Sequence, residues 1–311
     1  MTQAASASTT DGVALLYAVG RAHERLVQKK LDGALRSFLG PAGKPVEVYV
    51  PDRARSRDVV DLVVHFHGTA WLPEQAVDAL GNGSVAAVVN LGTGSGAYDR
   101  AFSDPAAFDS LLAGVTREVS AATGKPSRVR RVTLVGFSAG HGAVRAILRE
   151  PRHFAAVNAV LLLDGMHTSY VPEGSVLATG GALDTTNLVA FANFARAAMH
   201  GDKRFLVTHS EIFPGTFAST TETADWLLRA LGLHRTPVLR WGPHGMQQLT
   251  VAILLLGAIA GAAIAGWLAD RIGRRRTKIC SGCVYVIGAI GCALAQSCWE
   301  ILAARFWLGL A

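Results

Sequence analysis

The stretch Val132-Thr-Leu-Val-Gly-Phe-Ser-Ala-Gly-His141 decides the fold of the long N-terminal part of this chain. A short apolar run, typical of a buried strand, leads directly into Gly136-Phe-Ser138-Ala-Gly140, and the residues that follow have helical spacing. Glycine on both sides of Ser138 allows the chain to turn sharply without a Cβ clash. The pattern therefore predicts a strand, a tight turn that carries Ser138, and a helix.

Short apolar runs alternate with segments of helical spacing on both sides of this turn. We expect strands at residues 46–50, 61–66, 85–91, 131–135, 159–163 and 204–208, and a weaker one at 237–241. We expect helices at residues 14–38, 104–123, 140–149, 187–200 and 221–231. Strands that are apolar along their whole length suit a parallel sheet with helices on both faces. The fold class is therefore α/β, with a three-layer, mostly parallel sheet.

The composition changes sharply after Gln248. Residues 249–269 and 279–299 carry no charge, and each run is long enough to cross the ~30 Å hydrocarbon core of a bilayer as a helix. We therefore predict three parts: a disordered N-terminus over residues 1–12, an α/β domain over 13–248, and an all-α transmembrane hairpin over 249–311. The α/β domain ends with only the weak run 237–241, so it leaves little room for a well-formed last strand.

Ser138 is the predicted nucleophile. A serine hydroxyl reacts poorly at its own pKa and needs a base and a stabilised oxyanion. A turn between strand and helix holds the hydroxyl out into solvent, and the positive N-terminal end of the following helix faces the developing negative charge. The alternative is that Gly136 to Gly140 forms a purely structural turn.

The segments around Ser138, together with His65-Phe-His67-Gly-Thr69-Ala70, resemble those of α/β-hydrolase-fold serine hydrolases. The resemblance covers about residues 46–248. It implies hydrolysis of an ester or related small-molecule acyl substrate through a serine, an acid and a histidine in that chain order. It also implies an oxyanion hole formed by the amides of Ala139 and of Thr69 or its neighbours. We expect no cofactor.

Two carboxylates follow strands beyond the turn and qualify as the acid: Asp164 after residues 159–163, and Glu211 after residues 204–208. The chain order then requires a later histidine, and His244 lies in the expected loop after residues 237–241. Only four residues separate His244 from the apolar run. The alternative is therefore that the last strand and the catalytic histidine are missing and that His244 is an ordinary loop residue.

A basic segment, Gly266-Trp-Leu-Ala-Asp270-Arg271-Ile-Gly273-Arg274-Arg-Arg, joins the two apolar runs. It resembles the loop between the second and third helices of major facilitator superfamily transporters, especially sugar porters. The resemblance implies a multi-pass membrane location with the lipid bilayer as partner. Such transporters need two six-helix halves with a site between them. This chain carries two helices and the start of another, so we expect an anchor or a fragment, and not transport by this chain alone.

The net charge of +7 is concentrated in this basic segment and in Lys278. Because the charges flank apolar spans, we interpret them as a topology signal and expect no nucleic-acid partner. Cys280-Ser-Gly-Cys283 has metal-ligand spacing, but small residues at the start of a span favour helix packing, so we assign no metal.

Basic loops face the cytoplasm, which would place the α/β domain on the far side of the membrane. Residues 1–10 show no export signal. This conflict disappears if the two parts were joined by gene fusion or by an assembly error.

Overall fold

The computed structural model describes residues 27–236 and 243–311, with side chains from 249 onward in the second range. It divides into two compact units, Met1–His234 and Arg235–Ala311. The division falls ahead of the boundary after residue 248 that the composition suggests. The predicted disordered N-terminus and the predicted strand 237–241 lie outside the described residues.

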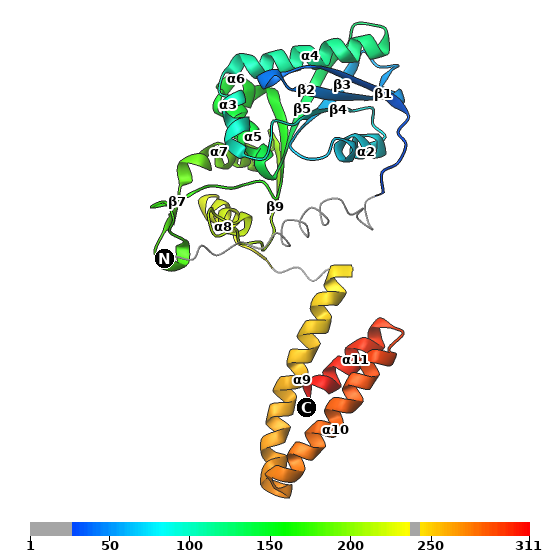
Figure 1. Ribbon diagram of the computed structural model, residues 1–311, viewed down its shortest axis with the longest axis vertical. Helices are drawn as coiled ribbons and strands as arrows, with labels where there is room; N and C mark the ends of the chain where they lie inside the picture. Colours follow the sequence, from blue (N-terminus) through cyan, green and yellow to red (C-terminus); the bar gives the residue numbers. More distant parts are fainter. Residues whose placement is uncertain (1–26, 237–242) are drawn as a thin grey trace, which may run out of the picture. The chain divides into compact units, whose positions relative to one another are not determined.

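A mixed, mostly parallel sheet forms the centre of the first unit (Figure 1). The strands lie in the order β1-β2-β4-β3-β5-β6-β9, with β3, β4, β5, β6 and β9 parallel and β2 antiparallel to both of its neighbours. Their bounds are β1 Gly33–Leu39, β2 Pro45–Pro51, β3 Val59–Phe66, β4 Val85–Val89, β5 Arg128–Phe137, β6 Val157–Leu163 and β9 Arg204–Thr208. A separate hairpin pairs β7 (Tyr170–Val171) with β8 (Ala182–Leu183). The predicted α/β class is confirmed, and the sheet with its tight turn after β5 is of the α/β-hydrolase type.

Helices connect most of the strands. They are α2 Trp71–Leu80, α3 Ser95–Ala101, α4 Pro105–Thr123, α5 His141–Arg149, α6 Pro151–Ala156, α7 Val189–Met199 and α8 Thr220–Ala230. Single 3-10 turns occur at η1 Pro41–Gly43, η2 Asp52–Ala54, η3 Ser138–Gly140, η4 Leu177–Thr179 and η5 Thr185–Asn187. The predicted start of α4 is confirmed, because the Asp104 carboxylate accepts a hydrogen bond from the Ala106 amide at 2.9 Å.

The two faces of the sheet are covered differently. Leu134 and Leu162 point to one face, where they join a large buried cluster with α4, α5 and α7. α2 lies on the opposite face, where Val77 packs with Tyr49 and Ala86 in a small cluster (Figure 1). The main core of this unit therefore lies between the sheet and α4, α5 and α7.

The predicted helix over residues 14–38 is wrong for its second half. Residues 33–39 form β1, which pairs antiparallel with β2 from Gly33 opposite Pro51 to Leu39 opposite Pro45. Residues 14–26 lie outside the described part. Phe38 of β1 packs so closely on Gly114 of α4 that a Cβ there would lie 2.3 Å from the ring. Pairing and packing at long range override the local apolar spacing.

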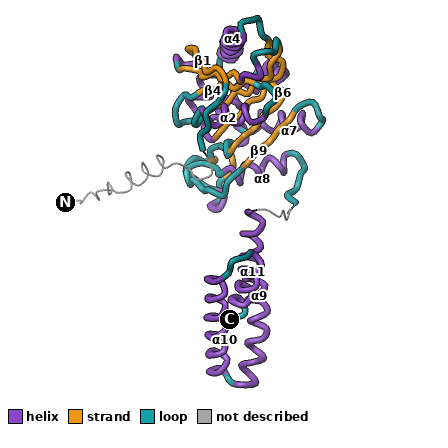
Figure 2. Tube along the Cα trace, turned by 90° about the vertical axis from the view of Figure 1, so that its right-hand side faces the viewer, coloured by secondary structure: helices purple, strands orange, loops and turns teal. Residues whose placement is uncertain are grey.

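The second unit consists of three helices, α9 Pro243–Ile272, α10 Arg274–Leu294 and α11 Cys298–Gly309 (Figure 2). By length and composition, Leu249–Ile272 and Arg274–Leu294 can each cross a membrane, and only 11% of each apolar window is buried. The second span therefore begins and ends earlier than the predicted run 279–299. The Arg-rich segment is not a loop: Gly273, with φ +87°, alone separates α9 from α10, and Arg274 lies in the first turn of α10.

Glycine positions bring α11 close to α9. A Cβ at Gly257 would lie 2.3 Å from the Phe306 carbonyl oxygen, and one at Gly309 would lie 2.2 Å from the Leu254 carbonyl oxygen. Small residues of this kind let helix backbones approach each other in a membrane protein. The packing of this unit thus depends on the absence of side chains at a few positions.

Candidate active site

The turn after β5 has the strained geometry that the Gly-x-Ser-x-Gly pattern predicts. Ser138 has φ +44° and begins η3, between β5 and α5. A Cβ at Gly140 would lie 2.0 Å from the Phe66 carbonyl oxygen, and one at Gly136 would lie 3.1 Å from the His141 amide nitrogen. The close approach of the turn to β3 therefore requires glycine at position 140, and position 136 is tightly packed against the start of the following helix.

His141 anchors this turn. Its Nδ1 lies 2.8 Å from the Ser138 carbonyl oxygen, so the ring donates to that oxygen. Burial lowers the pKa of His141 to about 3, which keeps the ring neutral at physiological pH. His141 therefore holds the backbone of the turn, in agreement with its position inside the packed helix α5.

The Ser138 side chain is half-buried. Within the described part of the chain its hydroxyl makes no hydrogen bond, to histidine or to any other residue. The hydroxyl thus has no base among residues 27–236.

The turn after β3 lies beside the turn after β5. His67 and Gly68 have φ +71° and +105°, and a Cβ at Gly68 would lie 3.2 Å from the Phe137 ring. The His67 ring stacks on Phe137 with centroids 6.0 Å apart and planes at 16°. Thr69, which follows, is exposed, whereas Ala139 is 8% exposed. The structure thus brings together the two segments that carry the predicted oxyanion-hole residues.

The two histidines of the β3 turn are not arranged as bases. His67 Nδ1 lies 3.0 Å from the Tyr98 hydroxyl, and His65 is 7% exposed. Burial lowers the pKa of both rings. Both are packing residues of the turn.

Asp164 ends β6 with φ +44° and is held by the segments that follow β9. One carboxylate oxygen accepts from the Ser210 amide at 3.0 Å and from the Thr220 hydroxyl, and the other accepts from the Ser210 hydroxyl at 2.9 Å. Partial burial acts in the opposite direction, but hydrogen bonds from Thr220 and Ser210 hold the pKa of Asp164 below its usual value. Asp164 is therefore an ionised and firmly bonded carboxylate.

Asp164 also lies next to the serine turn. A Cβ at the neighbouring Gly165 would lie 3.1 Å from the Ser138 amide nitrogen and 2.7 Å from the Gly136 carbonyl oxygen. His167 Nε2 lies 3.2 Å from the main-chain oxygen of Asp164 and not from its carboxylate. Within the described residues, no histidine side chain bonds to this carboxylate.

Glu211 differs from Asp164 in its exposure and in its hydrogen bonding. It is exposed, and within the described ranges its carboxylate makes neither a hydrogen bond nor an ion pair. It directly follows Ser210, whose amide and hydroxyl are both bonded to Asp164. The structure therefore places both predicted carboxylates at the carboxyl ends of adjacent strands, one bonded and one free.

His244 lies in the first turn of α9 and not in a loop, and its side chain is outside the described part. It belongs to the second unit, so its place relative to Ser138 is not defined.

Ser210 and Thr220 are site residues that the sequence analysis missed. Ser219 and Glu222 form a capping box at the start of α8, with the Ser219 hydroxyl 3.2 Å from the Glu222 amide. This Ser-x-x-Glu pattern is visible in the sequence and places Thr220 at a helix N-terminus. Its bond to Asp164, 56 residues away, depends on the fold.

The transporter-like motif gathers at the α9–α10 junction. Asp270 and Arg271 lie in the last turn of α9, Gly273 is the break, and Arg274 begins α10. Arg271 stacks on Trp267 at 5.2 Å from the ring centroid. Gly266 lies in α9, with no heavy atom within 4 Å of a Cβ built there.

Comparison with known families finds the model for "Sugar (and other) transporter" over residues 190–311. The chain is 44% identical over 65 residues to the probable metabolite transport protein CsbC of Bacillus subtilis (strain 168), and 42% identical over 65 residues to the D-xylose transporter of Levilactobacillus brevis. Each alignment covers 21% of this chain and 14% of the relative. The chain thus spans about a seventh of these transporters, and the matched residues 190–234 fold as part of the first unit.

Solved structures similar to this chain include esterases. An esterase from Rhizomucor miehei is 12% identical with a TM-score of 0.39, over 74% of this chain and 93% of that one. Carboxyl esterase 2 from Tuber melanosporum is 15% identical with a TM-score of 0.38, over 72% and 85% of the two chains. The sheet and the turn after β5 define the fold independently of these similarities. The chain thus joins an α/β unit with a tight serine turn after β5 to a segment similar to sugar transporters.

Proposed function

We propose that the first unit is a serine hydrolase that acts on an ester or related acyl substrate, with Ser138 as nucleophile. The observation that carries the proposal is the φ of +44° at Ser138 between a buried strand and a helix. Positive φ at a residue other than glycine is costly and persists where the surrounding structure imposes it, most often at functional sites. The turn is closely packed here: a Cβ at Gly140 would overlap the Phe66 carbonyl oxygen, and one at Gly136 would make tight contacts.

In this reaction the Ser138 hydroxyl oxygen attacks the acyl carbon, and the carbonyl electrons move to its oxygen. The amides of Ala139 and Thr69 donate to that oxyanion, and loss of one such donor typically lowers kcat by roughly 10²–10³-fold. The neighbouring positions of the two turns support this role. The acyl-enzyme is then hydrolysed by water.

A histidine must accept the Ser138 proton and return it to the leaving group. His244 fits the chain order for this role, and the alternative is that the catalytic histidine is missing. Asp164 and Glu211 are both candidates to orient such a ring: Asp164 is held beside the serine turn by Ser210 and Thr220, and Glu211 has both carboxylate oxygens unbonded within the described part. Without a histidine, the oxyanion donors and binding alone leave roughly 10³–10⁴-fold catalysis over water.

A fluorophosphonate probe applied to the full chain in detergent tests the proposal. We expect covalent labelling that Ser138→Ala abolishes and that Ser56→Ala, an exposed serine, leaves unchanged. His244→Ala and Glu211→Gln should slow labelling without abolishing folding. Absence of labelling on folded protein, shown by circular dichroism, would refute the hydrolase.

A second candidate function follows from the similarity to transporters: the chain is a fragment of a membrane transporter with an inactive soluble unit. α9 and α10 then insert as a multi-pass hairpin, and carbonate extraction should leave the chain in the membrane pellet. Membrane retention of folded chain without probe labelling would favour this function. Labelling that Ser138→Ala abolishes would favour the hydrolase.

A further inference from the structure

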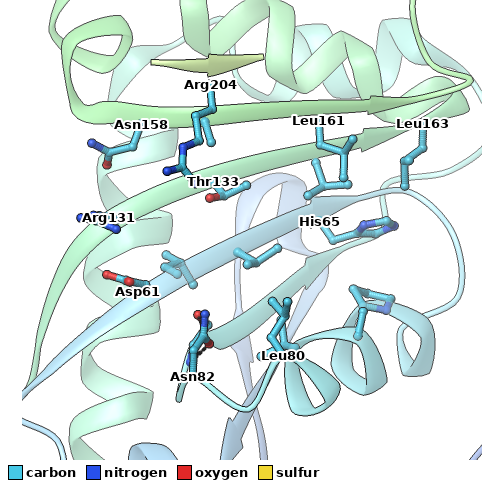
Figure 3. Close-up of a pocket in the computed structure, with 18 of the residues that line it drawn as sticks. Asp61, His65, Leu80, Asn82, Arg131, Thr133, Asn158, Leu161, Leu163 and Arg204 are labelled. Carbon is cyan, nitrogen blue, oxygen red and sulfur yellow. Dashed lines mark hydrogen bonds between the residues drawn. The ribbon is translucent and has the colours of Figure 1, made fainter. Parts of the chain in front are cut away.

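A large cavity lies on the face of the sheet that carries α2. Its volume is about 950 Å³, and β3, β5, β6, α2 and the start of β9 contribute to its lining (Figure 3). Ser138 is not among the described residues that line it. Cavities of this size that are mostly apolar, with a few polar groups, are typical of small-molecule sites. The cavity is therefore a candidate binding site that is separate from the proposed nucleophile.

One end of the cavity is apolar on both of its walls. On the sheet, Val135 lies opposite Leu161, and Phe137 lies opposite Leu163. The wall from α2 consists of residues four apart on one side of the helix: Leu72, Ala76 and Leu80. Phe137 is 42% exposed and Leu80 is 62% exposed. Exposed apolar surface on two walls of one cavity indicates that an apolar group binds between them.

Two arginines at the other end have unbonded guanidinium groups. Arg131 and Arg204 line the cavity and are exposed, and within the described part of the chain neither side chain makes a hydrogen bond or an ion pair. Arg131 lies two residues before Thr133 on β5, and Arg204 lies in the same row as Thr133, with Ala159 between them. This register places the Cα atoms of the two arginines about 12 Å apart. Both side chains can therefore reach one anion near Thr133 (Figure 3).

Cations outnumber carboxylates at this end of the cavity. The charged residues of the lining are Arg131, Lys203, Arg204, Asp61 and Asp202. Asp61 lies opposite Arg131, but its carboxylate accepts two hydrogen bonds from Arg130, at 3.0 and 2.9 Å. The Lys203 ammonium donates to two main-chain oxygens, at 2.6 and 3.2 Å. Because arginine binds a carboxylate through two parallel N–H donors, the two unbonded arginines suit a carboxylate ligand.

The length of the apolar end sets the size of the ligand. Phe137 lies four residues after Thr133 on β5, which is about 13 Å along a strand. An extended chain of single bonds advances about 1.2 Å per bond. A tail of about ten to twelve carbons therefore spans the apolar end.

We propose that this cavity binds a fatty acid of about ten to twelve carbons. Arg131 and Arg204 hold its carboxylate, and its tail lies between α2 and the apolar residues of β5 and β6, with the far end beside Phe137. This binding is independent of the proposed hydrolysis, because Ser138 does not belong to the described lining of the cavity.

Photolabelling of the full chain in phosphatidylcholine nanodiscs tests the proposal. The probe is dodecanoate with a diazirine at the end of its tail. We expect mass spectrometry to find the label in α2 and in residues 135–137 and 161–163, at least ten times more than with dodecanol that carries the same diazirine. Free dodecanoate should compete with the probe. Hexanoate, which covers about half of the apolar end, should compete at least ten times more weakly.

Variants of the two arginines test the carboxylate contact. Arg131→Gln combined with Arg204→Gln should reduce the labelling of these segments at least tenfold. The matched control combines Arg100→Gln on α3 with Arg229→Gln on α8, which are exposed arginines outside the lining and remove the same charge. This control and Ser138→Ala should leave the labelling unchanged. Circular dichroism establishes that each variant is folded.

Equal labelling of the two arginine double variants would overturn the proposal. Equal labelling by the fatty acid and the alcohol would also overturn it, and this comparison in the unmodified protein decides the question if the Arg131 and Arg204 variant fails to fold. Absence of label from α2 and from residues 135–137 and 161–163 would mean that protein, from this chain or from a second copy, covers the cavity. A loss of labelling in Ser138→Ala would instead place the probe at the proposed nucleophile.

Discussion

The two units of this protein differ in which residues have a positive φ. In the first unit, His67, Ser138 and Asp164 have positive φ at the ends of β3, β5 and β6, and none of them is glycine. In the described part of the second unit, Gly273 is the residue with positive φ. Residues other than glycine adopt positive φ only where the surrounding structure imposes it, whereas glycine adopts it readily. The first unit therefore holds strained strand ends, and the described part of the second unit has a glycine break.

The largest expected loss of stability comes from a substitution in the serine turn. Gly140→Ala should destabilise the first unit by about 3 kcal/mol or more, because the new Cβ would overlap the Phe66 carbonyl oxygen at 2.0 Å. Urea denaturation followed by pulse proteolysis measures the change. Gly94→Ala is the control, since no heavy atom lies within 4 Å of a Cβ there. Equal stabilities would mean that the turn is not tightly packed.

A substitution at Gly257, where α11 packs on α9, should lower the stability of the second unit. Gly257→Ala should destabilise it by about 1–3 kcal/mol, because α11 must move away from α9. Thermal unfolding in detergent measures this effect, with Gly266→Ala as the control without close neighbours. Equal unfolding temperatures for Gly257→Ala and Gly266→Ala would contradict the close packing of α11 on α9.

Asp164 should make the stability of the first unit depend on pH. Its folded-state pKa is depressed, so its stabilisation is present above the unfolded value of about 3.9 and is lost as pH falls through the folded value. The advantage of the unmodified protein over Asp164→Asn should therefore shrink as the pH falls below about 4. Urea midpoints between neutral and acidic pH test this. Glu211→Gln, at an unbonded carboxylate, should leave the curve unchanged, and a constant difference for Asp164→Asn would refute the linkage.

The smallest loss of stability is expected from a substitution at the surface of the second unit. Arg271→Gln removes the stacking on Trp267 and should cost about 0.5–1 kcal/mol. Thermal unfolding in detergent gives the value, and Arg275→Gln serves as a charge-matched control. A loss as large as that of Gly140→Ala would remove the contrast between strained turns and surface contacts.

Most elements of the α/β unit could be predicted from local pattern alone. Strand β9 was predicted with its observed bounds, and α4 was predicted at residues 104–123, one residue from its observed start. β1 could not be predicted, because its apolar residues have helical spacing and only pairing with β2 makes them a strand. Local periodicity reports which residues are buried together, and it fails where a distant partner decides the conformation.

In the candidate site, too, some features follow from the local sequence and others depend on contacts between distant residues. The serine turn and the two carboxylates were found because glycine, serine and acid residues follow buried strands in the sequence. The difference in hydrogen bonding between Asp164 and Glu211 could not be predicted, because it depends on Ser210 and Thr220, which reach Asp164 across the fold. The roles of Ser138, Ala139, Thr69 and His244 remain predictions, with the probe experiment as their test.

The sequence by itself determined where charge disappears after Gln248, which residues alternate as strands and helices, and where a serine stands between two glycines. Composition and spacing decide these features, since burial, membrane insertion and backbone freedom act residue by residue. Only the tertiary structure decided that β1 joins the sheet, that Asp164 is bonded while Glu211 is unbonded within the described part, and that a cavity lies beside α2. These features depend on contacts between residues far apart in the chain, and no local pattern records which distant partners meet.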